Sequence, residues 1–419
     1  MICSNFTVKT QEKAIQMRLR ATIMENRLSP TKLYQLLEKE EEFFLFDVRN
    51  SDAFEKWHIE GKTSIPTLNI PYFDLIEKGG KEDFQESIIH FIKTNLSEHL
   101  PKDKIIVVVC AKGETSAIIA DLLKNLGYQA TSLSGGMKNW GDFYERKTII
   151  ASPNLSIYQL IRVSRGCLSY VIVSNGMATI IDPLKNIQLY IDLIEELHVK
   201  LQFILDTHAH ADHISGGKEL ADRFGVPYYL HPYDGIHPMD MLPAKFSYEP
   251  SWVDKKYRLG SIELQALHIP GHTLGNQAFL LDNKFLFAGD SIFIGSVSRP
   301  DLGGQAKTWT TLHYESLRKL LALPTDVIVL PAHFSSLLES NKTLTFSSSL
   351  GELKKNNEGL IMAQKSLEEF SEYILANLPQ FPEEYINIKR INIGLLQVDE
   401  EQATELELGK NICAVKHPK

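Results

Sequence analysis

The stretch THAHADH, at residues 207–213, decides how the rest of the chain is interpreted. It follows the apolar run LQFIL, which predicts a buried strand. Within six residues it offers four potential metal ligands: His208, His210, Asp212 and His213. The residues between them are alanines, small enough to let the ligands converge. Imidazole and carboxylate groups suit zinc, iron or manganese. The stretch therefore predicts a metal site at the end of a strand.

Three later segments each place a candidate ligand after an apolar run. They are His272 in IPGHT, Asp290 in FAGD and His333 in LPAH. Any one of them alone would be a weak signal, but together and in this order they indicate one metal centre built from several loops. His268 is expected in the core or behind the ligands. His231 and His237 flank a predicted loop and are expected at the surface.

These four segments, in this order, resemble the metallo-β-lactamase superfamily over roughly residues 150–419. The resemblance implies a sandwich of two mixed sheets flanked by helices, with metal at one edge. Within the superfamily, RVSRGCLSYVI, HIPGHT and GDSIFIGSVSRPD are most similar to the persulfide dioxygenases. That family implies one iron held by His208, His272 and Asp290. Two histidines and one carboxylate leave a face of Fe(II) open for O₂.

The residues themselves leave a second interpretation open. A two-metal site would also use His210, Asp212, His213 and His333, and all four are present. A dinuclear zinc hydrolase of the glyoxalase II type, which cleaves a thioester with a metal-bound hydroxide, therefore remains an alternative. Arg299, in GSVSRPD, is a candidate for binding a substrate carboxylate, because arginine suits bidentate capture. The alternative for Arg299 is a structural ion pair with Asp301.

The stretch CAKGETS, at residues 110–116, lies between the strand-like run IIVVV and a predicted helix. Backbone amides of the loop and the N-terminus of the helix favour a thiolate at Cys110. Gly113 permits the tight turn that directs these amides inward. Together with DVRNSDAFEKWHIEG (47–61) and LSGGMKNW (133–140), the stretch resembles the rhodanese family, over roughly residues 27–146. The resemblance implies that Cys110 carries sulfane sulfur as a persulfide, with Asp47 and Arg49 as structural partners.

One position departs from the rhodanese pattern. Rhodanese loops commonly carry arginine where this chain has Thr115, and that arginine helps to hold an anionic donor such as thiosulfate. We therefore expect Cys110 to exchange sulfur better with a thiol persulfide than with thiosulfate. Gly113, Thr115 and Arg299 are the expected substrate-binding residues.

The order of predicted elements gives an α/β protein with two domains. An N-terminal extension (1–26) precedes a rhodanese-like domain (27–146), in which strands alternate with helices and predict a parallel sheet covered on both faces. The segment 142–156 is interpreted as a linker. The second domain (147–419) carries the metal motifs and a C-terminal helical tail. Asn175-Gly176 predicts a two-residue hairpin turn.

Composition narrows the functional classes. The 419 residues carry a net charge of −8 and no basic stripe, so a nucleic-acid partner is not expected. No apolar run is long enough to span a membrane. Four cysteines in so long a chain do not form a disulfide framework, so a cytoplasmic location is expected. A homodimer is possible within the resembling family.

The two resemblances together predict one sulfur chemistry. The expected reaction is oxidation of a low-molecular-weight thiol persulfide by O₂ to sulfite and thiol at one Fe(II). Sulfane-sulfur transfer through Cys110 accompanies it, with thiosulfate or sulfite as partner. The alternative is a zinc thioesterase attached to an inactive or docking rhodanese module.

Overall fold

The computed structural model describes residues 27–415, which form two compact units divided between Phe143 and Tyr144. The predicted extension, 1–26, lies outside the described residues. The segment predicted as a linker is instead largely a strand, β5 (Tyr144–Ala151), which pairs antiparallel with β6 (Ser156–Arg162). The second unit therefore begins three residues earlier than the sequence suggested. Among the described residues, no helix is both long and apolar enough to cross a membrane.

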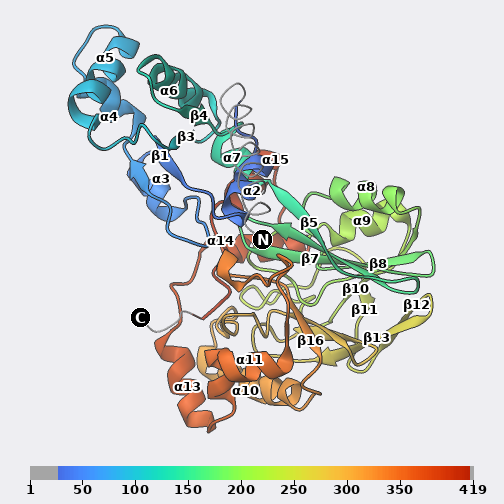
Figure 1. Ribbon diagram of the computed structural model, residues 1–419. Coiled ribbons are helices and arrows are strands. Elements are labelled where there is room, and N and C mark those ends of the chain that lie inside the picture. The colour runs from blue at the N-terminus through green and yellow to red at the C-terminus, as the bar shows by residue number, and fades with distance from the viewer. Residues whose placement is uncertain (1–26, 416–419) are drawn as a thin grey trace, which may run out of the picture. The chain divides into compact units, whose positions relative to one another are not determined.

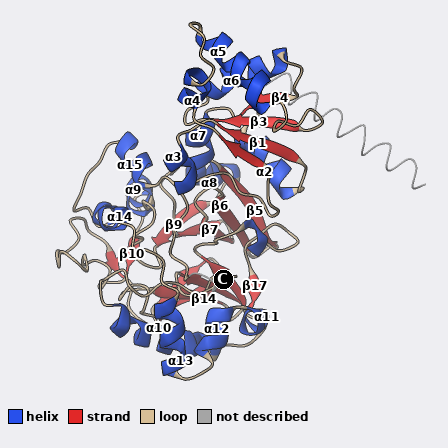
Figure 2. Cartoon of the chain, turned by 90° about the vertical axis from the view of Figure 1, so that its left-hand side faces the viewer, coloured by secondary structure: helices blue, strands red, loops and turns tan. Residues whose placement is uncertain are grey.

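The first unit is built on a four-stranded parallel sheet in the order β2-β1-β3-β4. Figure 2 shows α4, α5 and α6 on one side of this sheet and α2, α3 and α7 on the other. The strands are β1 (Phe43–Asp47), β2 (Thr67–Asn69), β3 (Ile105–Val109) and β4 (Ala130–Ser132). The helices are α2 (Pro30–Glu38), α3 (Ser51–Lys56), α4 (Tyr72–Glu77), α5 (Phe84–Phe91, continued by a π-helical turn, Ile92–Leu96), α6 (Glu114–Asn125) and α7 (Gly136–Gly141).

The continuous apolar runs of this unit arise because the sheet is covered on both faces. All five residues of β3 are buried. Phe46 and Val108 pack with side chains from α4, α5 and α6. Leu45 and Val107 alternate with them and are also buried, so they face the opposite layer of helices. The expected doubly covered parallel sheet is therefore present.

The second unit is a sandwich of two mixed sheets (Figures 1 and 2). Its seven-stranded sheet has the order β11-β10-β9-β8-β7-β6-β5, and its six-stranded sheet runs β12 to β17 in sequence. The remaining strands are β7 (Cys167–Ser174), β8 (Met177–Ile181), β9 (Lys200–Leu205), β10 (Tyr228–Leu230), β11 (Glu249–Pro250), β12 (Lys256–Leu259), β13 (Ile262–His268), β14 (Gln277–Leu281), β15 (Phe285–Gly289), β16 (Ile328–Pro331) and β17 (Ser348–Ser349).

Helices cover the outer faces of this sandwich. One core cluster joins the first sheet to α8 and α9, and another joins the second sheet to α10, α11, α12 and α13. Aromatic pairs such as Tyr170 with Phe287 fill the space between the sheets. The helices are α8 (Gln188–Glu196), α9 (Gly217–Phe224), α10 (Ala306–Leu321), α11 (Leu350–Asn356), α12 (Glu358–Ala363), α13 (Leu367–Ala376), α14 (Glu384–Asn392) and α15 (Glu400–Leu406), with a 3₁₀ turn at Leu337–Glu339.

Local signals set several of these boundaries. Asn175 and Gly176 both adopt positive φ and join β7 to β8, as the hairpin signal predicted. Ser366 caps α13 in a capping box with Glu369. These two boundaries therefore follow from short-range chemistry.

The C-terminal segment is fixed to the metal-motif region by buried charges. Glu407 lies 2.8 Å from Arg162, and both side chains are almost fully buried. The other carboxylate oxygen of Glu407 accepts a hydrogen bond from the Ile214 amide, directly after THAHADH. Arg165 donates to the backbone oxygens of Asp212 and Gly409. These contacts join the end of the chain to the loop that carries the candidate ligands.

We predict that Glu407→Ala destabilises the second unit strongly. It leaves Arg162 buried without its main partner, which typically costs about 3–5 kcal/mol. Glu405→Ala is the matched control, because Glu405 is exposed on the same helix and should change stability by less than about 0.5 kcal/mol. Pulse proteolysis in urea, read through peptides from residues 144–415, measures the free energy of unfolding. Equal stability of the two variants would contradict the prediction.

Candidate functional site

The candidate ligands come from loops of both sheets and meet at one edge of the sandwich. THAHADH follows β9, His272 follows β13, Asp290 follows β15 and His333 follows β16. The side chains of all seven candidate ligands are at most 1% exposed. The structure therefore brings together segments that lie more than a hundred residues apart in the sequence.

His208, His272 and Asp290 form one group whose ligand atoms all lie within 4.8 Å of one another. The Nε2 atom of His272 lies 3.2 Å from Oδ2 of Asp290, and Nε2 of His208 lies 3.9 Å from the same oxygen. Among residues 27–415, none of these three atoms has a hydrogen-bond partner. Three unpaired polar atoms that converge in a buried space are the arrangement that a bound cation would satisfy.

Each ligand of this group is held by its other polar atom. Thr207 donates its hydroxyl hydrogen to Asp182, so its oxygen accepts a hydrogen bond from Nδ1 of His208 at 2.9 Å. The Nδ1 atom of His272 donates to the backbone oxygen of Arg299 at 2.9 Å. These bonds fix the tautomers and leave Nε2 of both histidines with a lone pair.

The electrostatic environment suits a divalent cation. Burial and the neighbouring His210 and His272 hold the pKa of His208 well below its ordinary value. Burial also lowers the pKa of His272. Burial opposes ionisation of Asp290, but the adjacent His333 and His272 lower the pKa of that carboxyl. Two neutral imidazoles and one carboxylate are the protonation states that metal binding requires.

His210 lies outside this group. Its Nε2 atom is 3.2 Å from Oδ1 of Asp182, and it forms a separate buried group with Asp182 and Asp206. Burial lowers the pKa of His210, but Asp182 outweighs that effect and raises it to about 9. The structure thus pairs His210 with carboxylates rather than adding it to His208, His272 and Asp290.

The remaining candidates form a second group beside the first. Asp212 lies 3.2 Å from His213 and 2.8 Å from His333. Nδ1 of His333 also donates to Oδ1 of Asp290 at 2.6 Å. Burial lowers the pKa of His333, but Asp212 and Asp290 together hold it well above its ordinary value. His333 therefore bridges two carboxylates and positions Asp290.

Two cysteines also line this region, which the sequence did not predict. Cys167 is buried and lies 3.4 Å from Oδ2 of Asp212. Cys413 is grouped with Asp212, Asp290 and His333. Cys167 lies there because the start of β7 forms a backbone bridge with His333, far along the chain. Burial and the charge of Asp212 raise the pKa of the Cys167 thiol to about 11, so it is a neutral thiol here.

The loop that carries His272 depends on Gly271. Its φ of +148° lies in a region that residues with side chains rarely adopt, and a Cβ there would approach the Cα of His313 to 2.5 Å. The PGHT motif therefore uses glycine to let α10 approach the metal loop closely.

Arg299 forms the structural ion pair with Asp301 that the sequence left open as the alternative to substrate binding. Its side chain is fully buried and pairs with Asp301 at 2.6 Å. Its other donors bind the backbone oxygens of Pro379, Gln380 and Ile412. All five N–H groups of the guanidinium are thus used within the chain. The backbone oxygen of Arg299 accepts a hydrogen bond from His272, and its side chain donates hydrogen bonds to the C-terminal segment.

Helix α14 supplies contacts that sequence reasoning missed. Tyr385, Lys389 and Asn392 recur at intervals of four and three residues on one face. Asn392 donates to the backbone oxygens of His210 and His213. Lys389 lies 3.6 Å from Asp234, which in turn accepts hydrogen bonds from the Ala209 amide and the Thr273 hydroxyl. The helical spacing was visible in the sequence, but its target was not.

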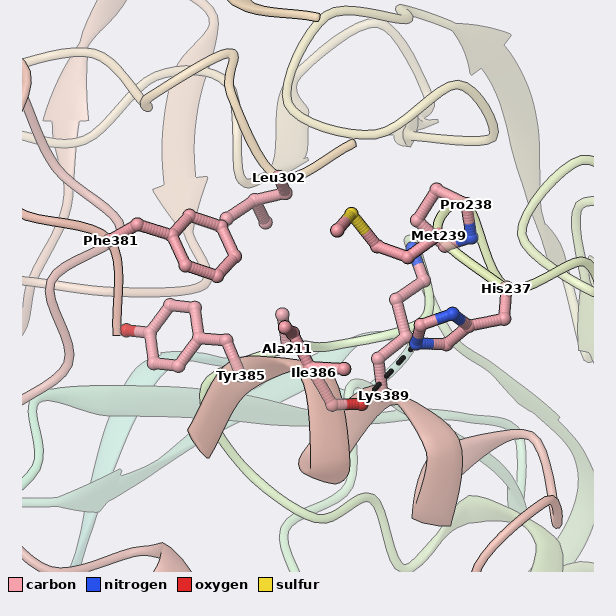
Figure 3. A pocket seen from close by; sticks show the side chains of 9 residues that line it. All are labelled: Ala211, His237, Pro238, Met239, Leu302, Phe381, Tyr385, Ile386 and Lys389. Carbon is pink, nitrogen blue, oxygen red and sulfur yellow. Dashed lines mark hydrogen bonds between the residues drawn. The ribbon is translucent and has the colours of Figure 1, made fainter. Parts of the chain in front are cut away.

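Figure 3 shows where this helix meets the metal loop. Tyr385, Ile386 and Lys389 line a small pocket together with Ala211 and His237. Its volume of about 10 Å³ admits a single water molecule. The expectation that His231 and His237 lie at the surface is wrong, because both are at most 2% exposed. His237 contacts the backbone oxygen of Ile386, and His231 stacks on His268.

Cys110 directly follows β3 and faces the start of α6. The amides of Gly113 and Ser116 donate to its sulfur at 3.1 and 3.4 Å. Gly113 has a φ of +89°, and a Cβ there would lie 2.7 Å from the amide nitrogen of Gly135. The segment LSGGM, at residues 133–137, packs against this loop, since the amide of Met137 donates a hydrogen bond to the backbone oxygen of Cys110. The predicted cradle of inward amides is present.

A cavity of about 280 Å³ adjoins Cys110 within the first unit, and Thr115 lies in its wall. Asp47 and Arg49, expected as structural partners, form an ion pair at 2.7 Å beside it.

Comparison with known families agrees with this architecture. Residues 29–142 match the model of the rhodanese-like domain, and residues 163–333 match that of the metallo-beta-lactamase superfamily. The chain is 30% identical to a probable metallo-hydrolase of Bacillus subtilis, YqgX, over 39% of this chain and 83% of that protein. The chain belongs to the metallo-beta-lactamase superfamily. Its N-terminal unit is a rhodanese-like domain, as predicted from the sequence.

Other members of the superfamily carry different names. The chain is 29% identical to hydroxyacylglutathione hydrolase of Pelagibacter ubique, over 59% of this chain and 96% of that protein. A solved metallo-beta-lactamase from Staphylococcus aureus covers 59% of this chain and 75% of its own, with 25% identity and a TM-score of 0.53. The structure of ETHE1 from Myxococcus xanthus covers 57% of this chain and 99% of its own, with 26% identity and a TM-score of 0.48.

We predict that His208→Ala, His272→Ala and Asp290→Ala each weaken metal binding by more than about a hundredfold, because each would remove one of three expected ligands. His333→Ala should weaken it by about ten- to a hundredfold, since in a one-metal site it would only position Asp290. His268→Ala is the control, because His268 bonds to the Leu274 oxygen outside this group. Metal content after anaerobic reconstitution and desalting is the measurement. Two ions per chain, with one lost in His333→Ala, would contradict the assignment.

Proposed function

We propose that the second domain oxidises a low-molecular-weight thiol persulfide with O₂ to sulfite and thiol at a single non-haem Fe(II). We further propose that the rhodanese-like domain carries sulfane sulfur on Cys110. One observation carries the first proposal: the three unpaired, converging atoms belong to two histidines and one aspartate. This is the ligand set of oxygenases that leave coordination positions open for O₂ and substrate.

The net reaction balances as R–S–SH + O₂ + H₂O → R–SH + SO₃²⁻ + 2H⁺. Bound Fe(II) would supply activation of O₂ and a position for the outer sulfur of the persulfide. His208, His272 and Asp290 would hold it from one side. His333 keeps Asp290 oriented through the hydrogen bond at 2.6 Å. Phe293 lies near His333, with ring centroids 6.1 Å apart, and packs in one apolar cluster with Trp309 and with Ala211 of the metal loop.

The contacts of two further candidates support a one-metal site. Nε2 of His210 is engaged by Asp182, and His333 is engaged by two carboxylates at once. A second metal would have to replace the contact between His333 and Asp212, although Nδ1 of His210 and Nε2 of His213 have no hydrogen-bond partner among the described residues. The fusion to a rhodanese-like domain supports the proposed persulfide chemistry, since both reactions act on sulfane sulfur.

A competing function is hydrolysis of a thioester at two zinc ions. The grouping of Asp212, His213 and His333 favours it, because these residues could hold a second ion. The similarity to a hydroxyacylglutathione hydrolase favours it as well. The rhodanese-like domain would then be a passenger or docking module.

The decisive experiment compares two metal forms of the full chain. Fe(II)-loaded protein should consume O₂ and form, from glutathione persulfide, sulfite and thiosulfate whose sum equals the O₂ consumed, whereas zinc-loaded protein should not. His208→Ala, His272→Ala and Asp290→Ala should each lower this rate at least about a hundredfold. Hydrolysis of S-lactoylglutathione by the zinc form, without O₂ uptake by the iron form, would establish the competing function.

A second prediction separates the two domains. Cys110→Ser should stop sulfur transfer from a persulfide to sulfite, because a serine oxygen cannot carry sulfane sulfur. It should leave O₂ uptake from free glutathione persulfide within about twofold of the wild type. Ser116→Ala is a matched control that keeps the thiol and removes only a hydroxyl 3.3 Å from its sulfur. Loss of O₂ uptake in Cys110→Ser would show that the metal centre depends on the cysteine.

A further inference from the structure

The size and lining of the cavity beside Cys110 restrict which sulfur donors it can bind. Its volume of about 280 Å³ is near the lower end for small-molecule sites. It is large enough for the part of a thiol that adjoins the sulfur. The residues that line it are Val48, Arg49, Asn50, Ala53, Tyr72, Phe73, Cys110, Ala111 and Thr115.

The one cation in this wall is already neutralised. Arg49 forms a bidentate pair with Asp47, with contacts of 2.7 to 3.0 Å. Its other contacts are the backbone oxygens of Ala53 and Trp57. Four of its five N–H groups are therefore committed to the chain. An incoming dianion would meet almost no net positive charge from this side chain.

Two amides of the loop serve the sulfur of Cys110 and not a bound oxyanion. The Gly113 and Ser116 amides are directed at the Cys110 sulfur itself. They can stabilise negative charge on Cys110 or on a sulfur bound to it. The flanking Lys112 and Glu114 are exposed, carry opposite charges and do not line the cavity. The other polar side chains of the wall are Thr115, Asn50 and Tyr72, which are neutral, whereas hydrogen bonds from charged donors are the strong ones for a sulfonate.

The outer wall is aromatic. Phe73 follows Tyr72, the first residue of α4, and its side chain is 72% exposed although it borders the cavity. The two rings contact each other with centroids 5.5 Å apart. An exposed phenyl ring at the mouth of a reactive-thiol pocket is a surface that an uncharged organic group can cover. It offers nothing to a hydrated oxyanion.

We propose that the sulfur partner of Cys110 is an organic persulfide whose carbons next to the sulfur are uncharged, and that this body packs on Phe73 and Tyr72. Thiosulfate is excluded as an efficient donor. This inference rests on the proposed role of Cys110 as a sulfur carrier. The rhodanese-like domain would then use the same class of substrate as the proposed metal reaction.

The transfer step balances without an added oxidant or reductant. The Cys110 thiolate attacks the outer sulfur of R–S–SH and forms a new S–S bond. The bond between the two sulfurs of the donor breaks, and R–S⁻ leaves with the electron pair. The products are Cys110–S–SH and R–S⁻. The Gly113 and Ser116 amides face the sulfur throughout.

The test measures loading of Cys110 under anaerobic conditions, where O₂ cannot consume the donor. The full chain is mixed with glutathione persulfide or with thiosulfate, and intact mass follows the gain of one sulfur. Cys110→Ser supplies the blank. We expect the second-order rate constant for the persulfide to exceed that for thiosulfate by at least about tenfold, the factor expected when charged hydrogen bonds to the sulfonate are missing.

Three variants test which side chains cause the preference for the persulfide over thiosulfate. Phe73→Ala should slow loading from the persulfide severalfold and leave loading from thiosulfate unchanged. Phe84→Ala is the matched control, because Phe84 is 39% exposed on α5 of the same domain and does not line the cavity. Thr115→Arg should raise the rate with thiosulfate selectively. If Phe73→Ala does not fold, the ratio of the two donors in the wild type still decides.

The outcomes separate the two proposals. Faster loading from the persulfide, with the selective effect of Phe73→Ala, supports the inference. Equal or faster loading from thiosulfate overturns it and leaves Cys110 as a sulfur carrier. Loading from neither donor overturns the role of Cys110 itself. Loss of both rates in Phe73→Ala, with normal folding, would show that the ring supports the loop and does not select the donor.

Discussion

The metal-binding side chains are held in place by the atoms that face away from the centre. Thr207 holds Nδ1 of His208, the backbone oxygen of Arg299 holds Nδ1 of His272, and His333 holds one oxygen of Asp290. Each of these partners belongs to a different loop. The geometry of the centre thus depends on how the two sheets bring their loops together, and α14 and the C-terminal segment hold those loops in place.

This arrangement concentrates negative charge in a dry space, and the fold compensates for it with buried cations. Asp182, Asp206, Asp212, Asp234 and Asp290 are all at most 1% exposed. Lys389 lies near Asp234, and His210 pairs with Asp182. Arg162 and Arg165 connect the same region to Glu407 and to the backbone of the C-terminal segment. A divalent cation on His208, His272 and Asp290 would complete the charge balance.

The sequence predicted those parts whose signals are local. Ligand spacing in THAHADH, the turn at Asn175-Gly176 and the amide cradle of CAKGETS all depend on a few neighbouring residues. The backbone acceptors of Arg299, in residues 379–412, could not be predicted because they lie far along the chain. The burial of His237, the approach of Cys167 to Asp212 and the face of α14 likewise depend on tertiary packing. The strand β5 was taken for a linker because its mixed charged and apolar residues, ERKTII, resemble an exposed segment.

The two proposed activities have a joint stoichiometry that follows from their products. Oxidation of one persulfide gives sulfite, and sulfite can accept the sulfur that Cys110 takes from a second persulfide. The sum is 2 R–S–SH + O₂ + H₂O → 2 R–SH + S₂O₃²⁻ + 2H⁺. Thiosulfate is then a product released from the rhodanese-like domain. Sulfite must enter the same cavity, and its reaction with the Cys110 persulfide passes through the same transition state as loading of Cys110 from thiosulfate, so the missing free cation slows both directions. Thr115 and the neutralised Arg49 therefore make an organic persulfide, rather than either oxyanion, the partner that this cavity favours.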